Sequence, residues 1–169
     1  MESRTGMIKL DTESVDTFLK FQYWAYARRF CDYGLDDTRI VEWHTLVELW
    51  LFGDRRNVPL LQNETVDLMN RKIVELWEVP SAQINTIYTH TMAGSKLRVY
   101  VIDIIGKTAG SKNYKDDTLR TKNQDALVDL LKGVWKADKP YWTKQDVGAL
   151  DMCQYHVHEA GVQCNKGGK

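Results

Sequence analysis

Residues 46–63 read LVELWLFGDRRNVPLLQN and predict two helices joined by a very short connection. The apolar residues of the first helix recur at i, i+1, i+4 and i+5, which is the spacing of one helix face. They are Leu46, Val47, Trp50 and Leu51. Gly53 and the basic pair Arg55-Arg56 favour a helix end, and Pro59 suits the first turn of the next helix. The two helices should therefore fold back on one another as a hairpin.

Helical spacing continues after this hairpin. Its second helix should run to Trp77, before Pro80, and a shorter helix should cover Ala82 to Tyr88. Ser95 is a suitable N-cap for the clearest helix of the chain, whose apolar residues recur at i, i+3, i+4, i+7 and i+8. The polar stretch from Gly106 to Thr121 should be a loop. A last helix, from Asn123 to about Trp135, presents one apolar face made of Leu127, Leu130, Leu131 and Val134.

The segment before the hairpin predicts one more helix. Residues 11–14 offer several helix caps, and the helix that follows should end near Arg28. The short apolar run Met7-Ile8-Lys9-Leu10 is consistent with a strand. We therefore expect a mainly α bundle of about five or six helices with minimal β structure. After Thr143 the chain has few periodic apolar residues, and its end, Asn165 to Lys169, is expected to be disordered.

The composition excludes several classes of function. Lysine plus arginine and aspartate plus glutamate both count 23, so the net charge is zero and gives no preference for nucleic acid or an anionic membrane. No apolar stretch approaches the roughly 20 residues that span a bilayer, and we expect no signal peptide. The prediction is an intracellular protein of the cytoplasm or nucleus that binds a protein partner or itself.

Three cysteines, Cys31, Cys153 and Cys164, are an odd number, which favours thiols or metal ligands over disulfides. Cys153, His156, His158 and Cys164 together have the composition of a tetrahedral zinc site. Their spacing differs from that of common zinc fingers, and two histidines two residues apart could converge only in an irregular loop. A docked or flexible tail without metal is the competing interpretation.

The remaining motifs do not assemble an active site. Gly106-Lys107-Thr108 imitates the end of a phosphate-binding loop, but the required first glycine would fall at Val101, inside a helix. His44 and His90 have no neighbouring nucleophile and orienting acid, so both are interpreted as solvated or capping residues. We therefore predict that the protein is not an enzyme and has no catalytic or cofactor-binding residues beyond a zinc ligand set.

Two stretches resemble a known family. Residues 15–30, VDTFLKFQYWAYARRF, resemble a helix of the BTB/POZ domain in its fungal form, with Phe18, Phe21, Trp24 and Tyr26 at matching positions. Residues 46–63 look like the helical hairpin that closes that domain, where the family usually has alanine in place of Gly53. The C-terminal pattern Cys-x-Tyr-His-x-His-x(5)-Cys is also similar to the end of fungal BTB proteins.

The resemblance implies a chain that lacks the N-terminal part of the domain. It would divide into a partial BTB/POZ-like helical region at 1–90, a helical extension at 91–152 and a Cys/His-containing tail at 153–169. It implies a non-catalytic interaction module that self-associates or serves as an adaptor, including toward a cullin-type ubiquitin ligase. The alternatives are a small structural or regulatory zinc-binding protein, and a truncated copy without independent function.

Overall fold

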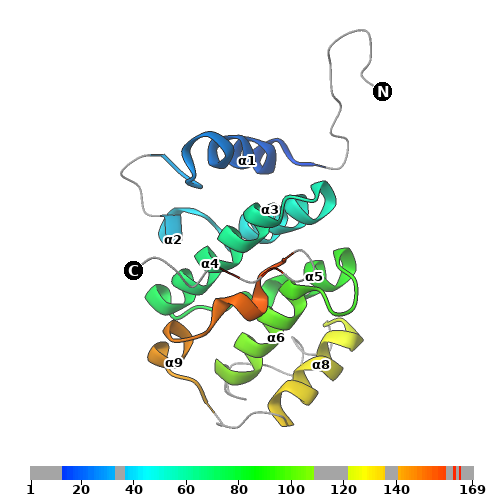
Figure 1. The fold of residues 1–169 in the computed structure, drawn as a ribbon. Helices are drawn as coiled ribbons and strands as arrows, with labels where there is room; N and C mark the ends of the chain where they lie inside the picture. The colour runs from blue at the N-terminus through cyan, green and yellow to red at the C-terminus, as the bar shows by residue number, and fades with distance from the viewer. Residues whose placement is uncertain are drawn as a thin grey trace.

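The computed structural model describes residues 13–32, 37–108, 122–135 and 141–158, together with Val162 and Cys164. Every regular element in these ranges is helical, so the expected mainly α fold is confirmed. Figure 1 shows α1 at one end of the molecule, the long α3 and α4 next to it, and α8 at the opposite end. The elements are α1 (Val15–Ala27), α2 (Asp37–Ile40), α3 (Trp43–Arg56), α4 (Pro59–Leu76), η1 (Ser81–Gln83), α5 (Ile84–His90), α6 (Lys96–Thr108), α8 (Gln124–Trp135), α9 (Lys144–Gly148) and η3 (Met152–Tyr155).

The hairpin predicted from residues 46–63 is formed by α3 and α4 and supplies much of the core. Asn57 ends α3 in the left-handed conformation, with φ of 52°, and Pro59 begins α4. The predicted helix end at Arg55-Arg56 is confirmed, although Asn57 forms the cap and Gly53 lies inside α3. A Cβ atom at Gly53 would lie 2.8 Å from Cγ of Gln62, so glycine here allows the close approach of α4.

The helix predicted before the hairpin is confirmed as α1 and packs against α3. Ser14 caps it by accepting a hydrogen bond from the backbone N–H of Thr17. The rings of Phe21 and Phe52 pack with centroids 4.6 Å apart, joining α1 to α3. The indole of Trp24 donates a 2.5 Å hydrogen bond to Glu64 on α4. One side of α1 is thus fastened to the hairpin.

The other end of the molecule is built from α5, α6 and α8. The predicted helices over 82–88 and after Ser95 are confirmed. The Ser95 hydroxyl, however, is buried and has no hydrogen-bond partner among the described residues, so it does not form the capping bond that we expected. Gly106 to Thr108 continue α6 rather than beginning a loop. The apolar face expected on α8 is only partly covered: Leu131 and Val134 are about half exposed, whereas Ala126 is buried.

Two short helices, α9 and η3, occupy the segment after Thr143, which has few periodic apolar residues and for which the sequence predicts no particular helix. Thr143 begins α9 with a capping box, in which its hydroxyl and the Asp146 carboxylate each accept a backbone N–H. Val147 of α9 is fully buried, and its carbonyl accepts a hydrogen bond from Asn70 on α4. Figure 1 shows this orange segment crossing the body of the molecule toward α4 and α6, which it contacts through α9 and η3.

Several expectations fall outside the described residues. These are the strand at Met7–Leu10, most of the 106–121 loop and the tail at 165–169. The division at residues 90 and 152 stays a prediction. Within the described ranges, no helix has the length and apolar character that crossing a bilayer requires.

Candidate metal centre

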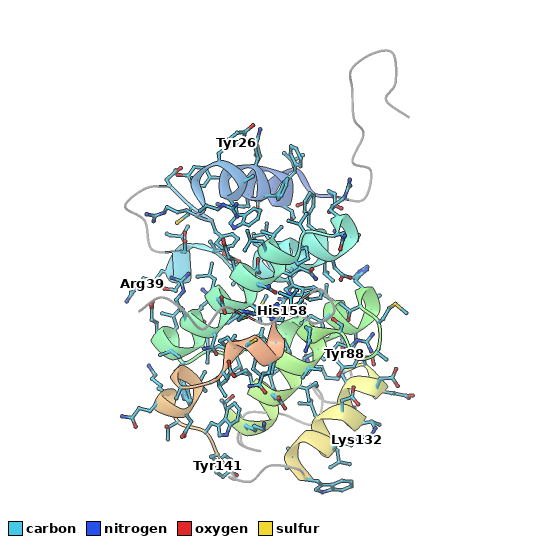
Figure 2. The ribbon with its side chains drawn as sticks, in the orientation of Figure 1. Tyr26, Arg39, Tyr88, Lys132, Tyr141 and His158 are labelled. Atoms are coloured by element: carbon cyan, nitrogen blue, oxygen red, sulfur yellow. The ribbon has the colours of Figure 1, made fainter. Side chains whose placement is uncertain are left out.

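The candidate site begins with a short irregular loop after η3. The Asp151 side chain accepts a hydrogen bond from the backbone N–H of Cys153, which caps η3. The backbone becomes extended at His156, so His156 and His158 follow the helix in an irregular loop, as their convergence requires. Figure 2 places His158 near the middle of the molecule, where the C-terminal segment crosses the helices.

Tyr155 anchors this loop to α6. Its side chain is 1% exposed, and its ring packs edge-on against Tyr100 at a centroid distance of 5.2 Å. Its hydroxyl donates a 3.0 Å hydrogen bond to Asp103. Burial, followed by the charge of Asp103 and this hydrogen bond, raises the pKa of Tyr155 above its usual range. The phenol therefore stays protonated and able to donate at neutral pH.

Asn63 of α4 holds the same loop through its backbone. Its side-chain Oδ1 accepts a 2.7 Å hydrogen bond from the Val157 N–H, and its Nδ2 donates a 3.1 Å bond to the Val157 carbonyl. This pair imitates the hydrogen bonds of a neighbouring β-strand and satisfies both backbone groups of one residue. The two histidines therefore flank a residue whose position α4 determines.

Three side chains of the cluster bring one ligand atom each into a common space. The Sγ of Cys153, the Nε2 of His158 and the Sγ of Cys164 all lie within 4.8 Å of one another. The Nε2 of His158 is 3.4 Å from the Cys153 sulfur and 3.3 Å from the Cys164 sulfur. Atoms separated in this way can bind one ion at their centre after small shifts, because zinc–sulfur bonds measure about 2.3 Å and zinc–nitrogen bonds about 2.0 Å.

His156 lies next to this group and contacts it through Cys164. Its Nδ1 lies 2.9 Å from the Cys164 sulfur, and its Nε2 lies 2.9 Å from Oδ1 of Asp67 on α4. Three of the four residues predicted from the sequence thus share a common space, and the fourth, His156, adjoins them through Cys164. Asp67 was not predicted, since it lies 89 residues before His156 and no spacing connects the two.

Burial and neighbouring groups raise the pKa of the Cys164 thiol to about 11. After burial, the causes are the hydrogen bond and the charge of Cys153, and then the charges of Asp67 and Asp151. Two thiolates cannot easily coexist here without a cation, so a metal ion would bind by replacing thiol protons.

The order Cys164, His156, Asp67 also imitates the nucleophile, base and orienting acid of a thiol hydrolase. An activated nucleophilic cysteine has a lowered pKa, which makes the thiolate available at neutral pH. Here the pKa of Cys164 is raised, its thiol also contacts Nε2 of His158, and its backbone N–H donates a hydrogen bond to the Cys153 sulfur.

The other sequence candidates lie apart from this cluster. The thiol of Cys31 is buried and donates a 2.7 Å hydrogen bond to Asp37. His44 and His90 are both exposed, as expected for solvated residues, and Gly106–Thr108 are helical, which does not fit a phosphate-binding loop.

A second surface feature lies between α1 and α3. A mainly apolar cavity of about 610 Å³ opens there, lined by Glu13, Ser14, Val15, Phe18, Phe21, Phe52 and Arg56. The outer face of α1 continues this apolar surface, since Val15, Leu19 and Tyr26 are 76%, 54% and 87% exposed. Figure 2 shows Tyr26 projecting from α1 away from the body.

Comparison of the chain with protein-family models, with curated proteins and with solved structures yields no match.

Proposed function

We propose that this chain is a small, non-catalytic zinc-binding protein in which one Zn²⁺ ion fastens the C-terminal segment to the helical body. The ligands would be Cys153, His156, His158 and Cys164. The observation that carries the proposal is the convergence of the Cys153 and Cys164 sulfurs with Nε2 of His158, beside which Nδ1 of His156 lies 2.9 Å from the Cys164 sulfur. Asn63 of α4 and the bond from Tyr155 to Asp103 of α6 hold this loop against the helical body.

The donor set favours zinc in a structural role. Thiolates and imidazoles together suit zinc, whereas calcium and magnesium require oxygen ligands. Four protein ligands fill a tetrahedral site and leave no open position for a catalytic water. The same set can bind cobalt(II) in place of zinc, which makes the coordination visible by spectroscopy.

A bound metal ion would stabilise the position of the C-terminal segment. Its two helices, α9 and η3, contain five and four residues, which is far too short for stable isolated helices. Their position therefore depends on tertiary contacts made by Val147, Tyr155 and the ligand loop. A structural zinc ion adds folding free energy at the end of this segment.

Cobalt(II) titration of the metal-free protein tests the proposal. We expect one equivalent to give the intense visible absorption of a tetrahedral site and a sulfur charge-transfer band. Cys153→Ser and Cys164→Ser should each weaken the charge-transfer band, because each removes one thiolate. Cys31→Ser is the matched control, since this thiol lies outside the cluster. A weak octahedral spectrum, or equal loss in the Cys31 variant, would refute this coordination.

We further propose protein interaction of the BTB/POZ type as a second candidate function, with self-association as its first form. Support comes from the apolar cavity between α1 and α3 and from the exposed apolar side chains on α1. A protein with three free thiols suits the reducing interior of a cell, in the cytoplasm or nucleus. Adaptor binding to a cullin-type ubiquitin ligase is the other form, and a binding assay with a purified cullin tests it.

Light scattering on a size-exclusion peak tests self-association. We expect a dimer whose mass falls to that of a monomer in Val15→Glu, because this exposed side chain lies at the mouth of the cavity and its replacement leaves the core intact. Val99→Glu on α6 is a matched control, also exposed but distant along the fold. A wild-type monomer at all concentrations would contradict self-association.

A further inference from the structure

We infer that Asp67 is the positioning residue of the metal centre, holding the His156 ring so that its Nδ1 faces the metal. This inference rests on the proposed zinc site and adds a residue from α4 that does not itself bind the ion. Zinc affinity would then depend on a residue of the α3–α4 hairpin as well as on the C-terminal loop.

The hydrogen bond to Asp67 determines which nitrogen of His156 can bind a metal. A neutral imidazole carries one N–H and one lone pair, and an ionised carboxylate only accepts hydrogen bonds. Because Asp67 lies 2.9 Å from Nε2, the proton belongs on Nε2 and the lone pair on Nδ1. Nδ1 is the atom that lies 2.9 Å from the Cys164 sulfur, one of the proposed ligand atoms.

Two side chains of α4 form the hydrogen bonds that position the His156 ring. Asn63, one helical turn before Asp67, holds the backbone N–H and carbonyl of Val157. Asp67 then holds the ring of the preceding residue, His156. A metal-bound histidine whose second nitrogen is fixed by a carboxylate has less orientational freedom to lose on binding and is more basic.

The geometry separates this role from direct coordination. Asp67 contacts Nε2, whereas Nδ1 faces the sulfur of Cys164, so the carboxylate lies behind the ring rather than beside the ligand atoms. Its side chain is 42% exposed, whereas that of His156 is 12% exposed. Replacement of Asp67 should therefore leave the fold intact and remove only the hydrogen bond that orients the His156 ring.

A double-mutant cycle on zinc affinity distinguishes positioning from a general effect of negative charge. Affinity is measured by competition with a chromophoric chelator in wild type, Asp67→Asn, His156→Ala and the double variant. Glu78→Gln is the matched control, because it removes the same charge from an exposed residue beyond the end of α4. Circular dichroism of the metal-free proteins checks that each variant folds.

We expect Asp67→Asn to weaken zinc binding by about 10- to 100-fold, the usual effect of losing such a carboxylate. In the His156→Ala background the same change should alter affinity by less than about twofold, because the ring through which Asp67 acts is absent. Asp67→Glu, which keeps a carboxylate, should restore part of the affinity, and Glu78→Gln should bind zinc like the wild type.

Two results would overturn the inference while leaving the zinc site standing. One is unchanged affinity in Asp67→Asn, and the other is an equal loss with and without His156, which would indicate a charge effect. Failure of the wild-type protein to bind zinc would instead refute the proposed function, and this inference with it.

Discussion

Replacement of Tyr155 tests whether the C-terminal segment is docked on the helical body as the site requires. Tyr155→Phe removes only the hydroxyl that donates to Asp103, and Tyr155→Ala removes the ring as well. The ring is 1% exposed and packs edge-on against Tyr100. The two variants therefore separate the hydrogen bond from the packing.

The expected losses follow from these contacts. A hydrogen bond to a charged group contributes about 1.5–3 kcal/mol to stability. The lower end applies here, because the Asp103 side chain is 26% exposed and also pairs with Lys107 at 3.4 Å. We expect Tyr155→Phe to lower the free energy of unfolding by about 1–2 kcal/mol. Removal of a buried aromatic ring costs about 3–5 kcal/mol, so Tyr155→Ala should lose about 4–7 kcal/mol in all.

Urea unfolding followed by tryptophan fluorescence measures these losses in the zinc-loaded protein. Limited proteolysis provides a second readout, because a segment that undocks by itself becomes cleavable before the body unfolds. A loss below about 1 kcal/mol for Tyr155→Ala, with unchanged proteolysis, would show that this residue is not buried against α6.

Two further predictions concern the body of the molecule. Trp50→Ala in α3 should lower the free energy of unfolding by about 3–5 kcal/mol, since this side chain is 2% exposed; a urea midpoint near that of wild type would place the ring outside the core. Burial, the hydrogen bond to Asp129 and the charge of Asp129 raise the pKa of Tyr88 in the folded protein. The unfolded chain has a tyrosine pKa of about 10. The stability that Tyr88 contributes is therefore complete below about pH 10 and declines as the pH rises above that value. Tyr88→Phe should therefore show a shallower fall in melting temperature above pH 10, and an unchanged slope would exclude this residue as a cause.

The α3–α4 hairpin could be predicted from sequence because local signals agree along its whole length. Apolar spacing, basic residues near a helix end and Pro59 all favour the same turn. The same kind of spacing correctly predicted α8, yet Leu131 and Val134 on its apolar face remain about half exposed. Periodicity indicates which side chains share a face, whereas their burial depends on whether another element covers that face.

The C-terminal segment could not be predicted in the same way. Helices of four or five residues contain too little sequence for a period to appear, so α9 and η3 were missed. Ligand chemistry identified Cys153, His156, His158 and Cys164, but the roles of Asn63 and Asp67 depend on tertiary contacts with α4.

The zinc content of the purified chain decides whether the proposed metal centre exists. The protein would be produced with zinc in the medium, passed through size exclusion and analysed for metal and protein in the same peak. We expect about one zinc ion per chain, because a tight structural site should be nearly full. A value below about 0.2 per chain in a folded, monodisperse peak would contradict it.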